Sequence, residues 1–118
     1  MRWLVHGTLS RAVDEALVRH EHSASRLDDE DRSSEEILEH ARVQQLDIVT
    51  DGDALVSAAT SGDSRFARSI VFLQLEGGEV EQDDAIDRLF ARYKRLTPGR
   101  LYTVTGSRVK VRQLPTGK

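Results

Sequence analysis

Short apolar runs alternate with amphipathic helical stretches along this chain, and this alternation restricts the possible folds more than any other feature. The clearest run spans Ser69 to Leu75, has Ile, Val, Phe and Leu at its centre, and is ended by two glycines. Shorter runs lie at Trp3–Val5 and Leu46–Thr50. Apolar runs of about four to eight residues are typical of buried strands. Strands separated by helical sequence predict parallel βαβ units.

Two serines mark the expected helix starts. Ser10 is a plausible N-cap for a helix that reaches about Arg19. Ser33 and Glu36 have the spacing of a capping box, in which the serine oxygen and the glutamate carboxylate each accept a backbone N–H. Apolar residues at helical spacing follow each serine. The predicted helices cover approximately 11–19, 33–43, 54–62 and 83–95.

The C-terminal part of the chain predicts a β-hairpin. Its arms cover 101–105 and 108–112, and a two-residue turn joins them at 106–107. In the second arm basic residues alternate with valines, so Arg108, Lys110 and Arg112 should share one face of the strand. Residues 22–26 are ambiguous between a poor strand and a loop, and 28–32 are expected to form an exposed loop.

These elements together predict the α/β fold class, with helices on both faces of a mostly parallel central sheet. The fold would have three layers, with the C-terminal hairpin adding an antiparallel edge. A chain of 118 residues suits a single domain, and we expect that domain to span 1–118.

Composition excludes several classes of protein. The chain has no cysteine, so it can form neither a disulfide nor a thiolate metal site. It has no apolar run near the ~20 residues that span a bilayer, so we expect no membrane partner. The apolar stretch after Met1 is too short for a signal peptide, which leaves the cytoplasm as the expected compartment.

The net charge of -3 conceals a strong asymmetry. Acidic clusters lie at 28–39 and 76–87, and no acid follows Asp87. This polarity either marks a surface that faces nucleic acid or consists of solvated faces that pair across the fold. The cations that follow Asp87 are Arg88, Arg92, Lys94, Arg95, Arg100, Arg108, Lys110, Arg112 and Lys118.

Parallel α/β sheets bind ligands at the carboxyl ends of their strands. Three segments should lie there: His6-Gly7-Thr8, Asp51-Gly52-Asp53 and the first turn of the helix that Ser33 caps. The order of elements and several short motifs further indicate what these segments could do. The motifs are Val5-His6-Gly7-Thr8-Leu9-Ser10, Ser33-Ser34-Glu35-Glu36-Ile37-Leu38 with Ala41, Ile48-Val49-Thr50-Asp51-Gly52-Asp53, Ser69 to Leu75 and Leu101 to Arg112.

In this order the motifs resemble the compact PIN-like proteins of the DUF5615 and Mut7-C-related type, over nearly the whole chain. That resemblance implies a cluster of carboxylates that holds Mg²⁺ or Mn²⁺ for phosphodiester hydrolysis. Many members of the family are toxins of toxin–antitoxin pairs or RNA-processing nucleases. Carried over to this chain, the catalytic and metal-binding acids would be Glu36, Asp51 and Asp53, and His6 would be an additional metal ligand.

The departures from the family pattern fall on the acids themselves. His6 stands where the leading Asp is expected, Gly7 where its neighbouring Glu would be, and Ser34 replaces the Asp of the helix motif. The third motif allows two registers. Without a gap, Gly52 and Ala54 take the acidic positions; with one residue deleted, Asp51 and Asp53 take them.

Two functions therefore follow from the resemblance. The first is a PIN-like domain with a degenerate metal site that binds RNA or a partner protein, such as an antitoxin-like protein, without catalysis. The alternative is an active Mn²⁺- or Mg²⁺-dependent ribonuclease of the toxin type. By analogy with small PIN-like domains, a homodimer is also possible.

Each candidate residue also has an ordinary structural explanation. Glu36 is explained by the capping box, and Asp51 and Asp53 by turn chemistry. His6 at a strand end often bonds to backbone. The three cations 108, 110 and 112 would either contact phosphate or guard the solvent face of an edge strand. Trp3 is expected in the core, and His20 and His22 at a solvated helix end.

Overall fold

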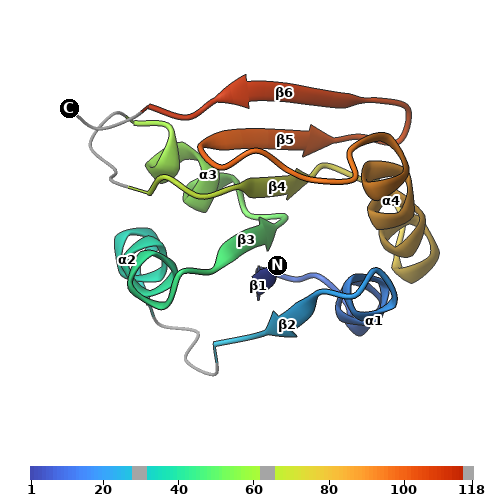
Figure 1. Cartoon of the computed structure of the whole chain (residues 1–118), viewed down its shortest axis with the longest axis horizontal. Helices are drawn as coiled ribbons and strands as arrows, with labels where there is room; N and C mark the ends of the chain where they lie inside the picture. The colour runs from blue at the N-terminus through green and yellow to red at the C-terminus, as the bar shows by residue number, and fades with distance from the viewer. Residues whose placement is uncertain (28–31, 62–65, 116–118) are drawn as a thin grey trace.

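A computed structural model describes residues 1–27, 32–61 and 66–115 of the chain. Its centre is a six-stranded sheet in the order β2-β1-β3-β4-β5-β6 (Figure 1). The strands are β1 (Arg2–His6), β2 (Ser23–Ser25), β3 (Asp47–Thr50), β4 (Ile70–Leu73), β5 (Arg100–Val104) and β6 (Val109–Gln113). Neighbouring strands from β2 to β5 are parallel, and β6 runs antiparallel to β5. The predicted mostly parallel sheet with a C-terminal hairpin is confirmed.

Helices cover both faces of this sheet, which confirms the three-layer α/β prediction. They are α1 (Arg11–Arg19), α2 (Ser34–Gln44), α3 (Asp53–Ala59) and α4 (Glu79–Arg92). α1 and α4 lie at the right of Figure 1, and α2 and α3 lie at the left. No helix within the described ranges is long and apolar enough to cross a membrane.

Alternation along the strands divides the core into two apolar clusters. Trp3 and Val5 of β1 pack with α1 and α4, which we call the α1/α4 face. Leu4 between them packs with α2 and α3 on the α2/α3 face. Because both faces of the central strands are covered, most positions in these strands are apolar. This explains the continuous apolar runs in the sequence, and Trp3 lies in the core as expected, with 1% of its surface exposed.

One connection in the sheet has an unusual hand. The chain steps from β3 to β4 and from β4 to β5 in the same direction, but α3 lies on one face and α4 on the other. Since these strands are parallel, the β4–α4–β5 connection has the opposite hand to the three connections before it. Nearly all such connections share one hand. The exception brings α4 beside α1.

The two serines cap the helices as the sequence predicted. The Ser10 side chain accepts from the Ala12 N–H at 3.2 Å. Ser33 accepts from the Glu36 N–H, and the Glu36 carboxylate accepts from the Ser33 N–H, both at 3.2 Å. The predicted capping box is therefore confirmed.

Some predicted boundaries differ from the structure. The helix expected over 83–95 is α4, which begins at Glu79 and ends at Arg92. It begins earlier because the Gly78 N–H donates to the Glu81 carboxylate at 2.7 Å, so the glycine caps the start of the helix. It ends earlier because Tyr93 takes an extended conformation and packs edge-on against Tyr102. The doubtful strand at 22–26 is β2, whereas residues 28–31, 62–63 and 118 of our predictions lie outside the described residues.

The helix end expected at His20 is confirmed, but His20 and His22 are both half-buried. His20 caps α1 and contacts the Asp87 carboxylate at 2.7 Å through Nε2. The His22 ring stacks on Phe90, and its Nδ1 accepts from the Trp3 indole N–H at 3.1 Å. His20 and His22 therefore both contribute to the packing between α1, β1 and α4.

Candidate functional site at the strand ends

The strand order creates one point where successive connections leave in opposite directions. From β1 the chain goes to β2 on one side and then returns to β3 on the other. Such a switch point is where α/β sheets usually bind ligands. A cleft of about 460 Å³ lies beside the carboxyl end of β1. Its lining residues are Leu4, Val5, His6, Gly7, Thr8, Arg26, Leu27, Arg32 and Ile37.

Asp51, the first residue after β3, is bound to the loop after β1. Its Oδ1 accepts from the Thr8 backbone N–H at 2.9 Å, and its Oδ2 accepts from the Thr8 hydroxyl. Both oxygens of the carboxylate therefore accept a hydrogen bond from the same residue. The interaction joins the loops that follow two neighbouring strands, and it assigns Asp51 a structural role.

Two glycines explain why Asp51 takes this orientation. Gly7 has a φ of +91°, and a Cβ there would lie 2.0 Å from the Asp51 Oδ1. A side chain at position 7 is thus incompatible with Asp51 as it lies. Gly52 faces a different neighbour, since a Cβ there would lie 3.4 Å from the His6 Cε1. The residue that faces His6 across the strand ends is accordingly Gly52 and not Asp51.

His6 is engaged by a buried hydroxyl. Its Nδ1 lies 2.8 Å from the Thr50 Oγ1, which also accepts from the Gly52 N–H at 2.9 Å. Partial burial lowers the pKa of His6, although the Asp51 charge opposes this, so the ring is neutral near pH 7. The contact with Thr50 therefore engages the Nδ1 side of the ring, and the Nε2 side makes no bond to another described residue. The expected backbone bond is replaced by one to a side chain.

The remaining two acids lie on helix starts. Glu36 is exposed and its Oε1 is the acceptor in the capping box. Asp53 is exposed in the first turn of α3. Across the described ranges, no three His, Asp or Glu side chains are grouped as ligands for a metal ion. His6, Glu36, Asp51 and Asp53 accordingly form no such group in the arrangement observed.

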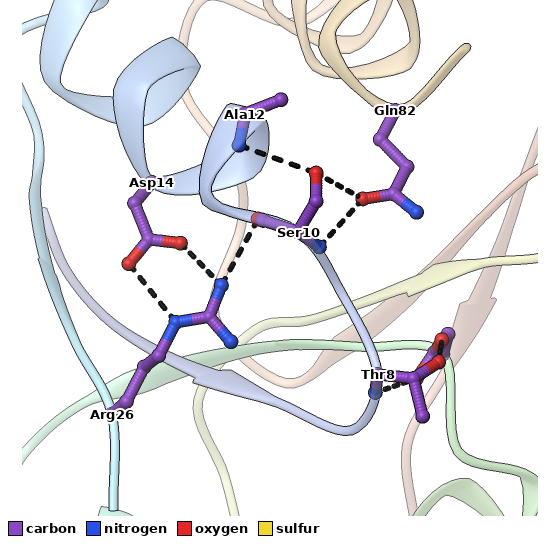
Figure 2. A network of polar contacts seen from close by, with 7 residues as sticks. Thr8, Ser10, Ala12, Asp14, Arg26 and Gln82 are labelled. Carbon is purple, nitrogen blue, oxygen red and sulfur yellow. Dashed lines mark hydrogen bonds and ion pairs between the residues drawn. The ribbon is translucent and has the colours of Figure 1, made fainter. Parts of the chain in front are cut away.

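The lining of the cleft contains two arginines, Arg26 and Arg32, and no acid among its described residues. Arg26 forms a two-pronged ion pair with Asp14 of α1, at 2.5 and 3.1 Å, and donates to the Ser10 carbonyl at 3.0 Å (Figure 2). Ser10 in turn contacts Gln82 of α4 through its N–H and its hydroxyl (Figure 2). These contacts fix the start of α1. Sequence reasoning missed them, because the partners are separated by 12 to 72 residues and form no local pattern.

The basic residues of the hairpin form a separate surface. Arg108, Lys110 and Arg112 are exposed, and the register pairs Lys110 with Thr103 and Arg112 with Leu101. Since Leu101 packs on the α2/α3 face, these side chains project to that face, and the prediction that they share a face is confirmed. β6 stands four strands away from β1 in the sheet, or roughly 19 Å at the usual strand spacing.

A further polar contact lies at the opposite ends of the strands. Asp47 begins β3 and is 1% exposed; its Oδ1 accepts from the Ser69 N–H at 2.9 Å. Its Oδ2 lies 3.5 Å from the Arg68 guanidinium. Burial raises the pKa of Asp47, and the Ser69 and Arg68 contacts oppose that rise. The contact links the amino ends of β3 and β4. Nothing in the local sequence distinguished this Asp from a surface acid.

Comparisons with known proteins complete the description of the site. No protein-family model, no curated protein and no solved structure matches this chain.

Proposed function

We propose that this chain is a PIN-like domain that has lost the acidic centre of its relatives and acts without catalysis, as a cytoplasmic module that binds a partner protein. The observation that carries the proposal is the pairing of Asp51 with Thr8. A nuclease of this type would need that carboxylate to face a metal ion and a phosphate. Here the position that faces His6 is held by Gly52, which has no ligand to offer.

This geometry also favours the ungapped register of the third motif. In that register the positions that face each other are 6 and 52, and the family pattern has an acid at each. The chain has histidine and glycine there. Both changes remove a hard oxygen ligand from the same place, which is consistent with the loss of a metal centre.

Protein is favoured over RNA as the partner because the chain offers no platform for bases. Of its six aromatic residues five are buried and Tyr93 is half-buried. Proteins that bind single-stranded RNA usually stack bases on exposed aromatic rings. The affinity for RNA would then depend on phosphate contacts alone.

The proposal is tested by incubating the purified chain with a fluorescently end-labelled single-stranded RNA in Mn²⁺ or Mg²⁺. Glu36→Gln and Asp51→Asn are the matched variants, because each removes a carboxylate charge with little change in size. We expect no cleavage, or a trace that is equal in all three proteins and so comes from a contaminant. Cleavage by the wild type that both variants abolish would establish the ribonuclease alternative.

A further inference from the structure

We propose that the outer edge of β6 binds an extended acidic segment of a partner protein as an additional β-strand. The inference rests on the proposed function, in that it names the binding surface and the chemistry of the partner. It uses no residue of the strand-end cleft, so the two can fail separately.

The backbone of β6 supplies the first observation. Hydrogen bonds join the Thr105 N–H to the Arg108 carbonyl and the Leu114 N–H to the Gly99 carbonyl, at 2.9 and 2.8 Å. In an antiparallel pair, bonded and non-bonded pairs alternate. From these two bonds, residues 108, 110, 112 and 114 bond inward to β5 or to its ends. The N–H and C=O groups of Val109, Val111 and Gln113 therefore point outward.

No strand or helix within the described ranges covers these outward groups. β6 ends the strand order, and four of its five residues are exposed. The other edge of the sheet is β2, which has only three residues. A row of unpaired backbone groups of this length is a template for strand addition.

The side chains of β6 determine which strand can be added. On the α2/α3 face Arg108, Lys110 and Arg112 are exposed, and within the described residues none of them forms an ion pair. On the other face Val109 is half-buried and Val111 is 36% exposed. A complementary strand has acidic residues at every second position and apolar residues between them, because cross-strand neighbours of opposite charge attract.

The same charges argue against a second copy of the chain. Pairing two β6 strands would set Arg and Lys of one copy against Arg and Lys of the other, which is destabilising. RNA could contact the three cations, but it would leave the outward N–H groups of the valines without a role. An acidic peptide uses both the charges and the backbone edge.

The test measures binding of a fluorescent synthetic peptide in which Glu and Val alternate, with a peptide of the same composition and all Glu in one block as the control. The decisive variant is Val111→Pro, which removes one outward N–H and leaves the inward bonds to β5 in place. Val111→Thr, which keeps that N–H, is its matched control. Lys110→Glu tests the charge, and Lys94→Glu, an exposed cation outside β6, is its control.

We expect the alternating peptide to bind and the block peptide to bind more weakly. Val111→Pro and Lys110→Glu should each weaken binding at least about tenfold, as the loss of one hydrogen bond or ion pair at an interface predicts. Val111→Thr and Lys94→Glu should bind like the wild type.

Three results would overturn the inference. Absence of peptide binding to the wild type would mean that the cations only guard the edge. Binding of single-stranded RNA that Lys110→Glu abolishes and Val111→Pro leaves intact, with no peptide binding, would make the surface a phosphate contact. A dimer of the wild type that Val111→Pro dissociates would make the occupant a second copy.

Amide hydrogen exchange on the wild type decides the matter if Val111→Pro fails to fold. The peptide should slow exchange at Val109, Val111 and Gln113 and leave the amide of Lys110, already bonded to β5, unchanged. Equal slowing at all four amides, or at none, would contradict strand addition.

Discussion

The contacts of Asp51 distinguish two possible roles of an acid that follows a strand. An acid in this position either holds a cation or closes a turn, and the sequence alone allows both. The structure adds the partner: Thr8 donates to both oxygens of the carboxylate. A sequence signal was present at position 7, where the glycine leaves room for the Asp51 carboxylate.

We predict that Asp51→Ala lowers the free energy of unfolding by about 1 to 2 kcal/mol, because the Thr8 N–H and hydroxyl lose their acceptor. Urea unfolding measures the effect. Asp53→Ala, at an exposed residue in a helix's first turn, is the control and should cost less than about 1 kcal/mol. If Asp51 were instead one of several clustered metal ligands, its removal would relieve repulsion, and stability would be unchanged or higher.

His22 makes stability dependent on pH. Burial is the main cause of its lowered pKa, the N-terminal ammonium and then His20 act in the same direction, and Glu21 opposes them. A histidine whose pKa is lower in the folded state binds fewer protons there than in the unfolded chain. Its contribution to stability is therefore present above the unfolded pKa of about 6.5 and is lost as the pH falls toward the folded value.

We predict that urea unfolding midpoints fall between pH ~7.5 and ~5.5, and that His22→Gln reduces this fall. Glutamine can still accept from the Trp3 indole N–H but does not titrate in this range. Trp3 is the only tryptophan, so its fluorescence reports the same region. A pH dependence equal in the wild type and the variant would show that His22 is not its source.

At the scale of elements, the parts fixed by local chemistry could be predicted. The two helix starts at Ser33 and Ser10, the apolar strands and the C-terminal hairpin each depend on neighbouring residues, and each is confirmed. The predicted two-residue turn is wrong in length, because residues 105–108 join the hairpin strands. The ends of α4 were predicted wrongly, because a glycine before the helix and a tyrosine pair after it set them.

Long-range arrangement could not be predicted in the same way. The reversed hand of the β4–α4–β5 connection follows from which face α4 covers, and hydrophobic spacing does not distinguish the two faces. The geometry of the candidate site also depends on long-range contacts and could not be predicted. The sequence placed the candidate residues at the strand ends, but only His6 of the four lines the cleft. The directions of Asp51 and Gly52 depend on contacts between segments more than 40 positions apart.

At the scale of the whole molecule, the chain separates two surfaces that a nuclease would combine. The described lining of the strand-end cleft contains no acid, whereas the exposed cations of β6 stand at the far edge of the sheet. A catalytic site must hold its metal and its phosphate ligand together. This separation supports binding without hydrolysis.

The most direct test of this account is thermal unfolding with and without millimolar Mn²⁺, for the wild type and for a variant with His6→Asp and Gly52→Asp. A ligand that binds the native state must raise the midpoint. We predict no shift for the wild type and a rise for the variant, which restores facing acids at positions 6 and 52. A rise of several degrees in the wild type that Glu36→Gln or Asp51→Asn removes would contradict the account and establish a metal centre at the strand ends.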